Sequence, residues 1–389
     1  MPLTESLDRL GTETAFQVLA RADELSRAGR DIINLGIGQP DFPTADHIVE
    51  AAVKALRDGA HGYTPAQGIL PLREAVARDL ARRHAAEVDP DTIMIMPGGK
   101  PTMFFATLMF GAPGTEIMYP DPGFPIYRSM IDYTGATAVP IKLSEETGFA
   151  FDVDQVLGQI TDRTRLIILN SPGNPTGGAV PEADMIRLAE GLERRPDVAI
   201  LSDEIYSRML YDGRRHHSLL RHPHLRDRLI VLDGWSKTYA MTGWRLGFSV
   251  WPQRWIDPIV RLAVNAHSCV NAATQHAGIA ALDGPQDAVD DMVTAFDARR
   301  GMIVERLNAL PGFRCGMPGG AFYAFANIEG TGLSARALQT LLLEDAGVAT
   351  IAGTSFGAYG EGFVRFSYAN SVENIAVAMD RISEVLANR

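Results

Sequence analysis

Short apolar segments alternate with helix-like segments along most of the chain, and this alternation constrains the fold more than any other feature. The apolar segments are bounded by Gly, Pro, Asn or Asp; they are Ile93–Met96, Glu116–Tyr119, Leu166–Leu169, Ala199–Leu201 and Leu229–Leu232. Helix-like segments such as Pro101–Phe110 and Pro181–Arg194 lie between them. This pattern is typical of a mostly parallel sheet covered by helices on both faces. We therefore predict an α/β fold that binds ligands beyond the carboxyl ends of its strands.

The C-terminal part of the chain has a different pattern. A long helical stretch, Ala288–Leu310, precedes the apolar run Gly319–Ile328, a helix-like segment at Ser334–Ala346 and the run Phe363–Asn370. This mixture indicates a smaller α+β domain. A chain of 389 residues usually divides into two domains. The predicted division is a large domain at 45–287 and a small domain formed by 1–44 and 288–389.

Composition narrows the class of protein. The formal net charge of -11 repels nucleic acid and anionic lipid on average. Cys269 and Cys315 give no disulfide framework and fit a reducing cytoplasm. The N-terminus lacks the basic start and apolar run of a signal peptide, and no uncharged apolar stretch reaches the ~18 residues of a membrane span. We therefore expect a cytoplasmic protein without nucleic-acid or membrane partners.

A lysine follows the last of the apolar segments. The stretch Gly234–Gly247 reads GWSKTYAMTGWRLG and places Lys237 where a core helix normally begins. Burying an ammonium there is costly, whereas a lysine whose pKa shifts on burial suits Schiff-base chemistry. Arg245, in the same stretch, could reach an anion near the lysine. Taken alone, a surface lysine in a loop explains the pattern equally well.

Two other strand ends carry polar side chains. The stretch Asn170–Gly178 reads NSPGNPTGG, and its tight turns could present Asn174 at the end of the sheet. After the next apolar segment, Asp203 could pair with a protonated ring nitrogen and Tyr206 could donate to a phenolate oxygen. The alternatives are plain turn chemistry for Asn174 and an ordinary helix N-cap for Asp203.

The turn Pro97–Pro101, which reads PGGKP, predicts an anion site. Its two glycines expose backbone N–H groups, and Pro101 suits the first position of a helix. A helix N-terminus with free N–H groups binds phosphate. The turn is not a P-loop because the upstream glycine is absent, and Gly36–Gly38 lacks the third glycine of a dinucleotide fingerprint.

These segments together supply a lysine, an aspartate, a tyrosine, an asparagine and an anion-binding turn. That is the set of groups that a phosphorylated pyridine aldehyde needs. No metal site is expected, because the His-rich loop of His216, His217, His222 and His224 lacks a further ligand set with zinc spacing.

A series of motifs extends from about Asp31 to Asn370. In order, they are NLGIGQPDF, GYTPAQGILPLREAV, PGGK, DPGFPIY, NSPGNPTGG, LSDEIY, SKTYAMTGWRLG, PGGAFYAF and VRFSYAN. In these motifs and their order the chain resembles the class I/II (fold type I) aminotransferases, close to the aspartate aminotransferase family. The resemblance implies pyridoxal 5′-phosphate as cofactor and a mostly parallel sheet sandwiched by helices, with a smaller α+β domain.

The resemblance also implies roles around the cofactor ring. Lys237 would carry the cofactor as a Schiff base and then move the proton between substrate and cofactor. Asp203 would keep the pyridine nitrogen protonated, and Tyr206 and Asn174 would bond the ring O3′. Phe124 would stack on the ring, at a position where the family often has Trp.

Further implied roles concern the phosphate and the substrate. Gly99, Lys100 through its backbone, Ser236 and Arg245 would hold the phosphate. Tyr63 would reach the phosphate of a neighbouring subunit, which predicts a homodimer.

For the substrate, Arg365 would bind the α-carboxylate in its planar fork, and Gly38 would close over the same carboxylate. Phe124 and Asn174 would also line the substrate site. In all, the resemblance predicts transfer of an amino group from an L-amino acid to a 2-oxo acid, in amino-acid biosynthesis.

The side chain of the substrate is less constrained. If Lys100 points into the pocket, it could read a distal carboxylate, which favours aspartate or glutamate with 2-oxoglutarate as acceptor. Lys100 facing solvent, or helping only the phosphate, is equally compatible with the sequence. Aromatic- and alanine-type substrates therefore stay open, as do a C–S lyase, a decarboxylase or a racemase on the same fold. A cofactor-sensing regulator is disfavoured because the segment before Asp31 is too short for an appended DNA-binding region.

Overall fold

The computed structural model describes residues 3–388. Its strands are β1 (Ile33–Asn34), β2 (Ile93–Met96), β3 (Glu116–Asp121), β4 (Thr137–Lys142), β5 (Thr164–Asn170), β6 (Ala199–Asp203), β7 (Leu229–Gly234), β8 (Gly247–Val250), β9 (Tyr323–Asn327), β10 (Val348–Ala349), β11 (Ile351–Ala352) and β12 (Phe363–Ser367). Its α-helices are α1 (Glu5–Asp8), α2 (Ala15–Arg27), α3 (Asp46–Arg57), α4 (Leu70–His84), α5 (Lys100–Phe110), α6 (Pro125–Thr134), α7 (Val153–Gln159), α8 (Glu182–Leu192), α9 (Trp235–Thr238), α10 (Ile256–His267), α11 (Ala272–Asp283), α12 (Asp287–Asn308), α13 (Ala335–Glu344) and α14 (Val372–Ala387).

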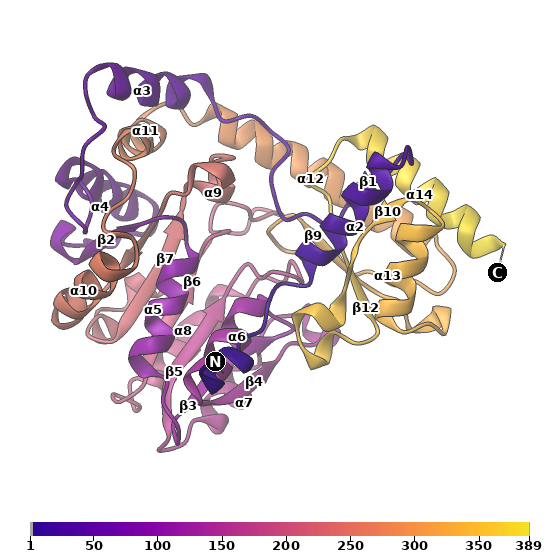
Figure 1. Ribbon diagram of the computed structural model, residues 1–389. Helices are drawn as coiled ribbons and strands as arrows, with labels where there is room; N and C mark the ends of the chain where they lie inside the picture. The colour runs from indigo at the N-terminus through magenta and orange to yellow at the C-terminus, as the bar shows by residue number, and fades with distance from the viewer. Residues whose placement is uncertain (1–2, 389) are drawn as a thin grey trace.

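The main sheet has the strand order β2-β8-β7-β6-β5-β3-β4 (Figure 1). Strands β3 to β7 pair in parallel along this order, and β8 is antiparallel to both of its neighbours. Because β2 and β7 both oppose β8, β2 runs in the same direction as the parallel strands. The turns after β2, β3, β5, β6 and β7 therefore all open at one end of the sheet. The predicted mostly parallel sheet is confirmed.

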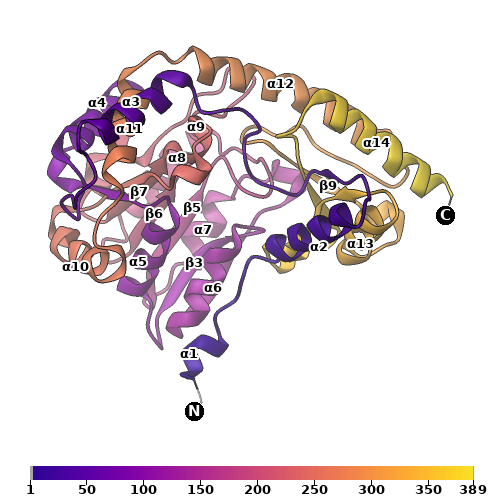
Figure 2. The same cartoon turned by 45° about the horizontal axis from the view of Figure 1, so that its top comes forward.

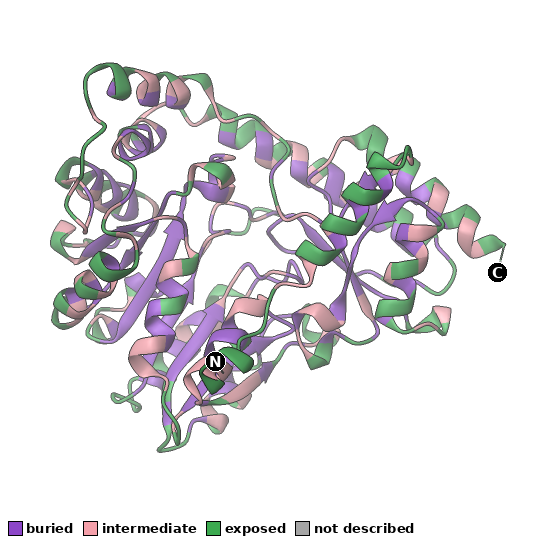
Figure 3. Ribbon diagram, in the orientation of Figure 1, coloured by how far each residue is buried: buried purple, intermediate pink, exposed green. Residues whose placement is uncertain are grey.

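Both faces of the central strands are buried, which explains why these strands are largely apolar. In β5, Leu166 and Ile168 join a cluster with α5, α6 and α10, whereas Ile167 and Leu169 join a second cluster with α4, α7, α8 and α11. Successive side chains of a strand point to opposite faces, so each strand serves both layers. Figure 3 shows the strands as buried and the outward faces of the helices as exposed.

The five strands predicted for the main sheet all form, and this sheet contains two further strands, β4 and β8, that were not predicted. β4 contains Pro140, which lowers the strand signal; the proline is tolerated because β4 is the edge strand. β8 is short and includes Gly247 and Ser249. The helix predicted from Pro101 begins one residue earlier, at Lys100, with Gly99 as its N-cap. Pro101 is therefore the second rather than the first helical residue.

Two small sheets form the rest of the fold. β1 pairs in parallel with β10, and β11-β12-β9 form an antiparallel sheet. A separate cluster that includes Phe296, Phe322, Phe366 and Ile382 packs these strands against α12 and α14. Figure 2 shows α12 running from the large sheet's helices toward α14.

The N-terminal segment touches both parts of the structure. Arg9, after α1, donates to the carbonyls of Asp132 and Tyr133 at the end of α6, at 2.9 and 3.2 Å. In α2, Arg21 pairs with Glu344 of α13 at 2.9 Å. The division into 45–287 and 1–44 with 288–389 stays a prediction, which the β1–β10 pairing favours. Within residues 3–388, no helix combines the length and apolar character needed to cross a membrane.

Candidate active site

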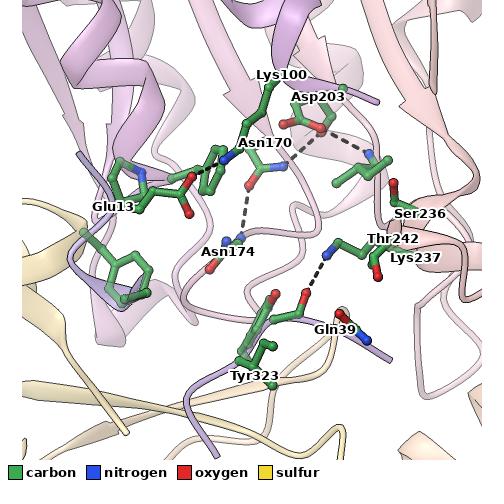
Figure 4. Close-up of a pocket in the computed structure, with 18 of the residues that line it drawn as sticks. Glu13, Gln39, Lys100, Asn170, Asn174, Asp203, Ser236, Lys237, Thr242 and Tyr323 are labelled. Carbon is green, nitrogen blue, oxygen red and sulfur yellow. Dashed lines mark hydrogen bonds and ion pairs between the residues drawn. The ribbon is translucent and has the colours of Figure 1, made fainter. Parts of the chain in front are cut away.

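A pocket of about 290 Å³ lies where the turns of the main sheet face the small sheets (Figure 4). Of the residues predicted for the site, only Tyr63 is not in its lining. The pocket is lined by Gly38, Gly99, Lys100, Phe124, Asn174, Asp203, Tyr206, Ser236, Lys237, Arg245 and Arg365. The fold thus brings together side chains from β12, from the N-terminal segment and from five turns of the main sheet.

Lys237 lies in the short helix α9, directly after β7. Its Nζ donates to the carbonyl oxygen of Gly38 at 2.5 Å. The pKa of Lys237 is lowered to about 8. Desolvation by burial is the main cause, and the neighbouring cations Arg365 and Arg245 add to it. The unprotonated fraction of this amine near neutral pH is therefore far larger than in an ordinary lysine, and that fraction is available as a nucleophile.

Asp203 ends β6 and is buried. Its Oδ2 accepts a hydrogen bond from the Tyr127 hydroxyl at 2.6 Å, and its Oδ1 accepts from the Ile205 amide at 3.2 Å. Burial raises the pKa of Asp203 to about 7, while both hydrogen bonds oppose that rise. A cation beside the carboxylate would favour its ionised form, so the position suits a protonated ring nitrogen.

An anion cradle surrounds the start of α5. Gly99 is the N-cap, so the first N–H groups of this helix have no partner within the helix. Arg245 donates to the carbonyls of Thr242 and Pro97 at 2.7 and 3.3 Å, and it holds the left-handed conformation at φ 56°. Such a conformation costs free energy in a non-glycine residue, and it is enriched at functional sites. Gly98, which faces the Arg245 guanidinium, holds a φ of 85°, a conformation that favours glycine.

Arg365 is buried in β12 and faces the same pocket. It donates to Asn174 Oδ1 at 2.8 Å and to the Gly36 carbonyl at 2.5 Å, and its guanidinium lies 4.6 Å from the ring centroid of Tyr323. Its Nε has no hydrogen-bond partner among the described residues. Burial lowers the pKa of Arg365, but a guanidinium stays charged in proteins. The group is a preorganised cation with a donor still free.

Tyr206 and Tyr323 meet beside this arginine. Their hydroxyls are 2.8 Å apart, and both rings are buried. Burial raises the pKa of Tyr206 well above its usual value, so its hydroxyl keeps its proton. A Cβ on Gly38 would collide with the Tyr323 hydroxyl. The close approach of the N-terminal segment to the pocket therefore depends on that glycine.

Lys100 points into the pocket, where it forms an ion pair with Glu13 (Figure 4). Its Nζ lies 5.6 Å from the ring centroids of both Phe16 and Phe124. The Lys100 side chain is also 46% exposed, so both sequence alternatives, reading a distal carboxylate or facing solvent, stay predictions. The sequence reading missed Glu13, because no motif surrounds it.

Other contributors were also missed. Tyr127 lies in the DPGFPIY motif and Tyr323 in PGGAFYAF, so their motifs were noticed without a role for either residue. Asn170 ends β5. Its side-chain Nδ2 donates to the Asp203 backbone carbonyl at 3.1 Å, and its Oδ1 accepts from the backbone N–H of Asn174 at 3.0 Å. A polar residue at the end of a buried strand was the available signal for Asn170.

Two predicted features lie outside the pocket. Tyr63 is 95% exposed, and its predicted role stays a prediction. In the His-rich loop, His217 contacts Glu182 and His222, each at 2.9 Å. Within the part of the chain that the structure describes, no group of three or more His, Cys, Asp or Glu side chains is arranged to hold a metal ion.

This set of groups fits one class of cofactor. A desolvated lysine, a buried aspartate, a hydroxyl and an amide surround one cavity, and a glycine turn with an arginine forms an anion cradle at its side. The fold and the site define an enzyme that binds a phosphorylated pyridine aldehyde.

Comparison with known proteins gives the family. A model of the family described as aminotransferase class I and II matches residues 30–382. The chain is 37% identical to aromatic-amino-acid aminotransferase 2 of Thermococcus litoralis, covering 94% of each protein, and 38% identical to an aspartate aminotransferase of Pyrococcus horikoshii, covering 92% and 91%. The solved structure of an alanine aminotransferase from Pyrococcus furiosus superposes with a TM-score of 0.93 at 30% identity, covering 100% of both chains.

The chain belongs to the class I and II aminotransferase family. It is a pyridoxal 5′-phosphate-dependent aminotransferase.

Proposed function

We propose that the chain transfers the amino group of an L-amino acid, with aspartate or glutamate as the preferred donors, to a 2-oxo acid such as 2-oxoglutarate. The observation that carries this proposal is the placement of two cations in one pocket with the desolvated amine of Lys237. Arg365 lies on the small-sheet side, and Lys100 lies at the start of α5. Two cations at separate points suit a substrate with two carboxylates.

Bound pyridoxal 5′-phosphate supplies an aldehyde that captures amines and a ring that withdraws electrons. Lys237 would hold its aldehyde carbon, and Asp203 would hold the proton on its ring nitrogen. Tyr206 and Asn174 would donate to its O3′, and Phe124 would cover one face of the ring. The phosphate would lie on the cradle of Gly99, the Lys100 backbone, Ser236 and Arg245.

The protein's own groups would then orient the substrate and move its proton. The Arg365 guanidinium would bind the α-carboxylate, with the backbone of Gly38 closing over it. The Lys237 amine, with a pKa lowered to about 8, would accept the proton of the substrate Cα and pass it to the cofactor carbon that carried the aldehyde. A base with a pKa near the working pH is suited to both transfers.

An aromatic- or alanine-type donor is the second candidate. The pocket lining includes Phe16, Leu19, Ile37 and Met103, which would pack well against an apolar side chain. The relatives' names span aspartate, aromatic and alanine aminotransferases. Both kinds of donor therefore belong in the test.

We further propose a homodimer in which Tyr63 of each subunit completes the other subunit's phosphate site. The support is the 95% exposure of this aromatic side chain, which leaves it available to a second subunit. The two free cysteines fit a reducing cytoplasm as the compartment. Co-expression of Lys237→Ala and Tyr63→Ala subunits tests the dimer, because a hybrid would contain one intact site and recover activity that neither parent has.

A panel of donors and acceptors tests the reaction. Aspartate, glutamate, phenylalanine and alanine are each paired with 2-oxoglutarate, pyruvate and oxaloacetate. We expect turnover only when an acceptor is present, with the highest kcat/KM for a dicarboxylic donor. Release of pyruvate or ammonia without an acceptor would instead indicate a lyase and overturn the proposal.

A further inference from the structure

Glu13 brings a carboxylate to the part of the pocket that would receive the substrate side chain, and the proposed function gives it no role. It precedes α2 and accepts a hydrogen bond from Lys100 Nζ (Figure 4). The Glu13 side chain is 13% exposed, whereas that of Lys100 is 46% exposed. The carboxylate is thus held in the pocket wall, while the lysine head has room to move away from it.

The segment that carries Glu13 is anchored on both sides. Before it, the Ser129 hydroxyl on α6 donates to the Gly11 carbonyl at 3.1 Å. After it, Arg21 of α2 pairs with Glu344 of α13 at 2.9 Å. Glu13 is therefore a fixed part of the pocket rather than a side chain on a loose terminus.

The charges of the pocket leave Lys100 as the cation that can respond to a substrate side chain. Among the described residues that line the pocket, the cations are Lys100, Lys237, Arg245 and Arg365. The proposed function assigns Arg245 to the phosphate, Lys237 to the aldehyde and Arg365 to the α-carboxylate. Lys100 remains, and Glu13 already neutralises it.

The surroundings of this ion pair are apolar. The Lys100 ammonium lies 5.6 Å from the ring centroids of Phe16 and Phe124, and Leu19 and Ile37 also line the pocket. While the pair is closed, a neutral side chain meets a wall without net charge. A distal carboxylate can gain Lys100 only by displacing Glu13, which would repel it at close range.

We propose that Glu13 determines specificity by competing with the distal carboxylate of a substrate for Lys100. While Glu13 and Lys100 are paired, the pocket admits aromatic and aliphatic substrate side chains. When the two residues separate, the pocket admits the side chain of a dicarboxylic substrate. Because both half-reactions of a transamination use one pocket, this exchange would let a neutral donor and a dicarboxylic acceptor alternate there. The inference rests on the proposed function, in which Lys100 reads the distal carboxylate.

Equilibrium binding of two unreactive acids to the holoenzyme tests the competition. Succinate carries a distal carboxylate, and 3-phenylpropanoate carries an aromatic ring in its place. Calorimetry gives both dissociation constants for the wild type, Glu13→Gln, Lys100→Met and the double variant. Glu13→Gln should tighten succinate about tenfold by removing a nearby like charge. The same change should leave the dissociation constant of 3-phenylpropanoate within about twofold of the wild-type value, because this ligand does not separate Glu13 from Lys100.

The other variants complete a double-mutant cycle. Lys100→Met should weaken the binding of succinate about tenfold. In the Lys100→Met background, Glu13→Gln should no longer tighten the binding of succinate. Glu24→Gln is the matched control, since Glu24 likewise forms an ion pair, with Arg21, but is exposed and outside the pocket. This control should change neither constant. Thermal melting verifies that each variant is folded.

Two outcomes would overturn the inference: Glu13→Gln leaves succinate binding unchanged or weaker, or it changes both ligands equally. Failure of the proposed function has a different signature. In that case the wild type would bind neither acid and would turn over no donor with any acceptor. An enzyme that transaminates normally while Glu13→Gln has no selective effect would contradict only the role of Glu13.

Discussion

The Tyr127 hydroxyl donates a hydrogen bond to Asp203 Oδ2 at 2.6 Å, and both side chains are buried. This bond opposes the effect of burial, which still raises the pKa of the Asp203 carboxyl group to about 7. The tyrosine thus helps to keep a buried anion ionised at the position proposed for the ring nitrogen. A carboxylate in this environment depends on its hydrogen bonds to remain charged.

Tyr127→Phe should therefore weaken cofactor binding near neutral pH. Loss of a hydrogen bond to a charged group costs roughly 1.5–3 kcal/mol, so the dissociation constant for pyridoxal 5′-phosphate should rise at least about tenfold at pH 7. The effect should shrink at pH 9, where Asp203 ionises without help. Titration of the apoenzyme at both pH values checks this, with Tyr133→Phe on the same helix as control. An equal loss at both pH values would count against the account.

The raised pKa of Asp203 also predicts how the stability of the apoenzyme depends on pH. The folded-state pKa of about 7 lies above the usual aspartate pKa of 3.8. This group therefore favours folding below about pH 4, and that contribution is lost as the pH rises through about 7. Asp203→Asn should melt at a higher temperature than the wild type at pH 8, and the difference should disappear toward pH 4. Melting curves measured across this pH range test the prediction. A difference in melting temperature that increases as the pH falls would contradict it.

Lys237 should titrate well below an ordinary lysine. Its pKa of about 8 follows mainly from burial, with Arg365 and Arg245 adding repulsion. Competitive acetylation of the apoenzyme, read by mass spectrometry, should give a labelling rate for this amine that rises through a midpoint near pH 8. A midpoint near the usual ~10.4 would mean that the site does not desolvate the amine.

Arg365→Leu should impair every amino donor alike. All donors present the same α-carboxylate, and removing one partner of a buried charge pair costs about 2–5 kcal/mol, so KM should rise by about a hundredfold. Steady-state kinetics with aspartate, phenylalanine and alanine measure this, with the exposed Arg314→Leu as control. A loss confined to one donor would show that Arg365 reads the side chain instead.

Much of the fold was predictable because local chemistry and tertiary structure agree in the main sheet. Segments such as Ile93–Met96 are apolar on both faces and flanked by turn residues, so the parallel arrangement followed from them. β4 was missed because Pro140 lowers its strand signal, although an edge strand tolerates it. Helix ends shifted by a residue or two, as at Lys100, since a helix can begin on either side of a glycine N-cap.

The site was predictable wherever its residues follow a strand directly, as Lys237 and Asp203 do. Parallel strands bring such positions to one end of the sheet. Glu13 was not predictable, because its contact with Lys100 joins residues far apart in the chain and depends on how the N-terminal segment crosses the pocket. Arg365 came from resemblance alone, since an arginine within a buried strand has no local signal for a ligand.

The central claim is that Lys237 is the amine that binds the cofactor. Borohydride reduction of the holoenzyme, followed by peptide mass spectrometry, tests this directly, because the lysines of the chain are few: Lys54, Lys100, Lys142 and Lys237. We predict a reduced pyridoxyl phosphate adduct on the peptide that contains Lys237. An adduct on another lysine, or none in the presence of excess cofactor, would contradict the account.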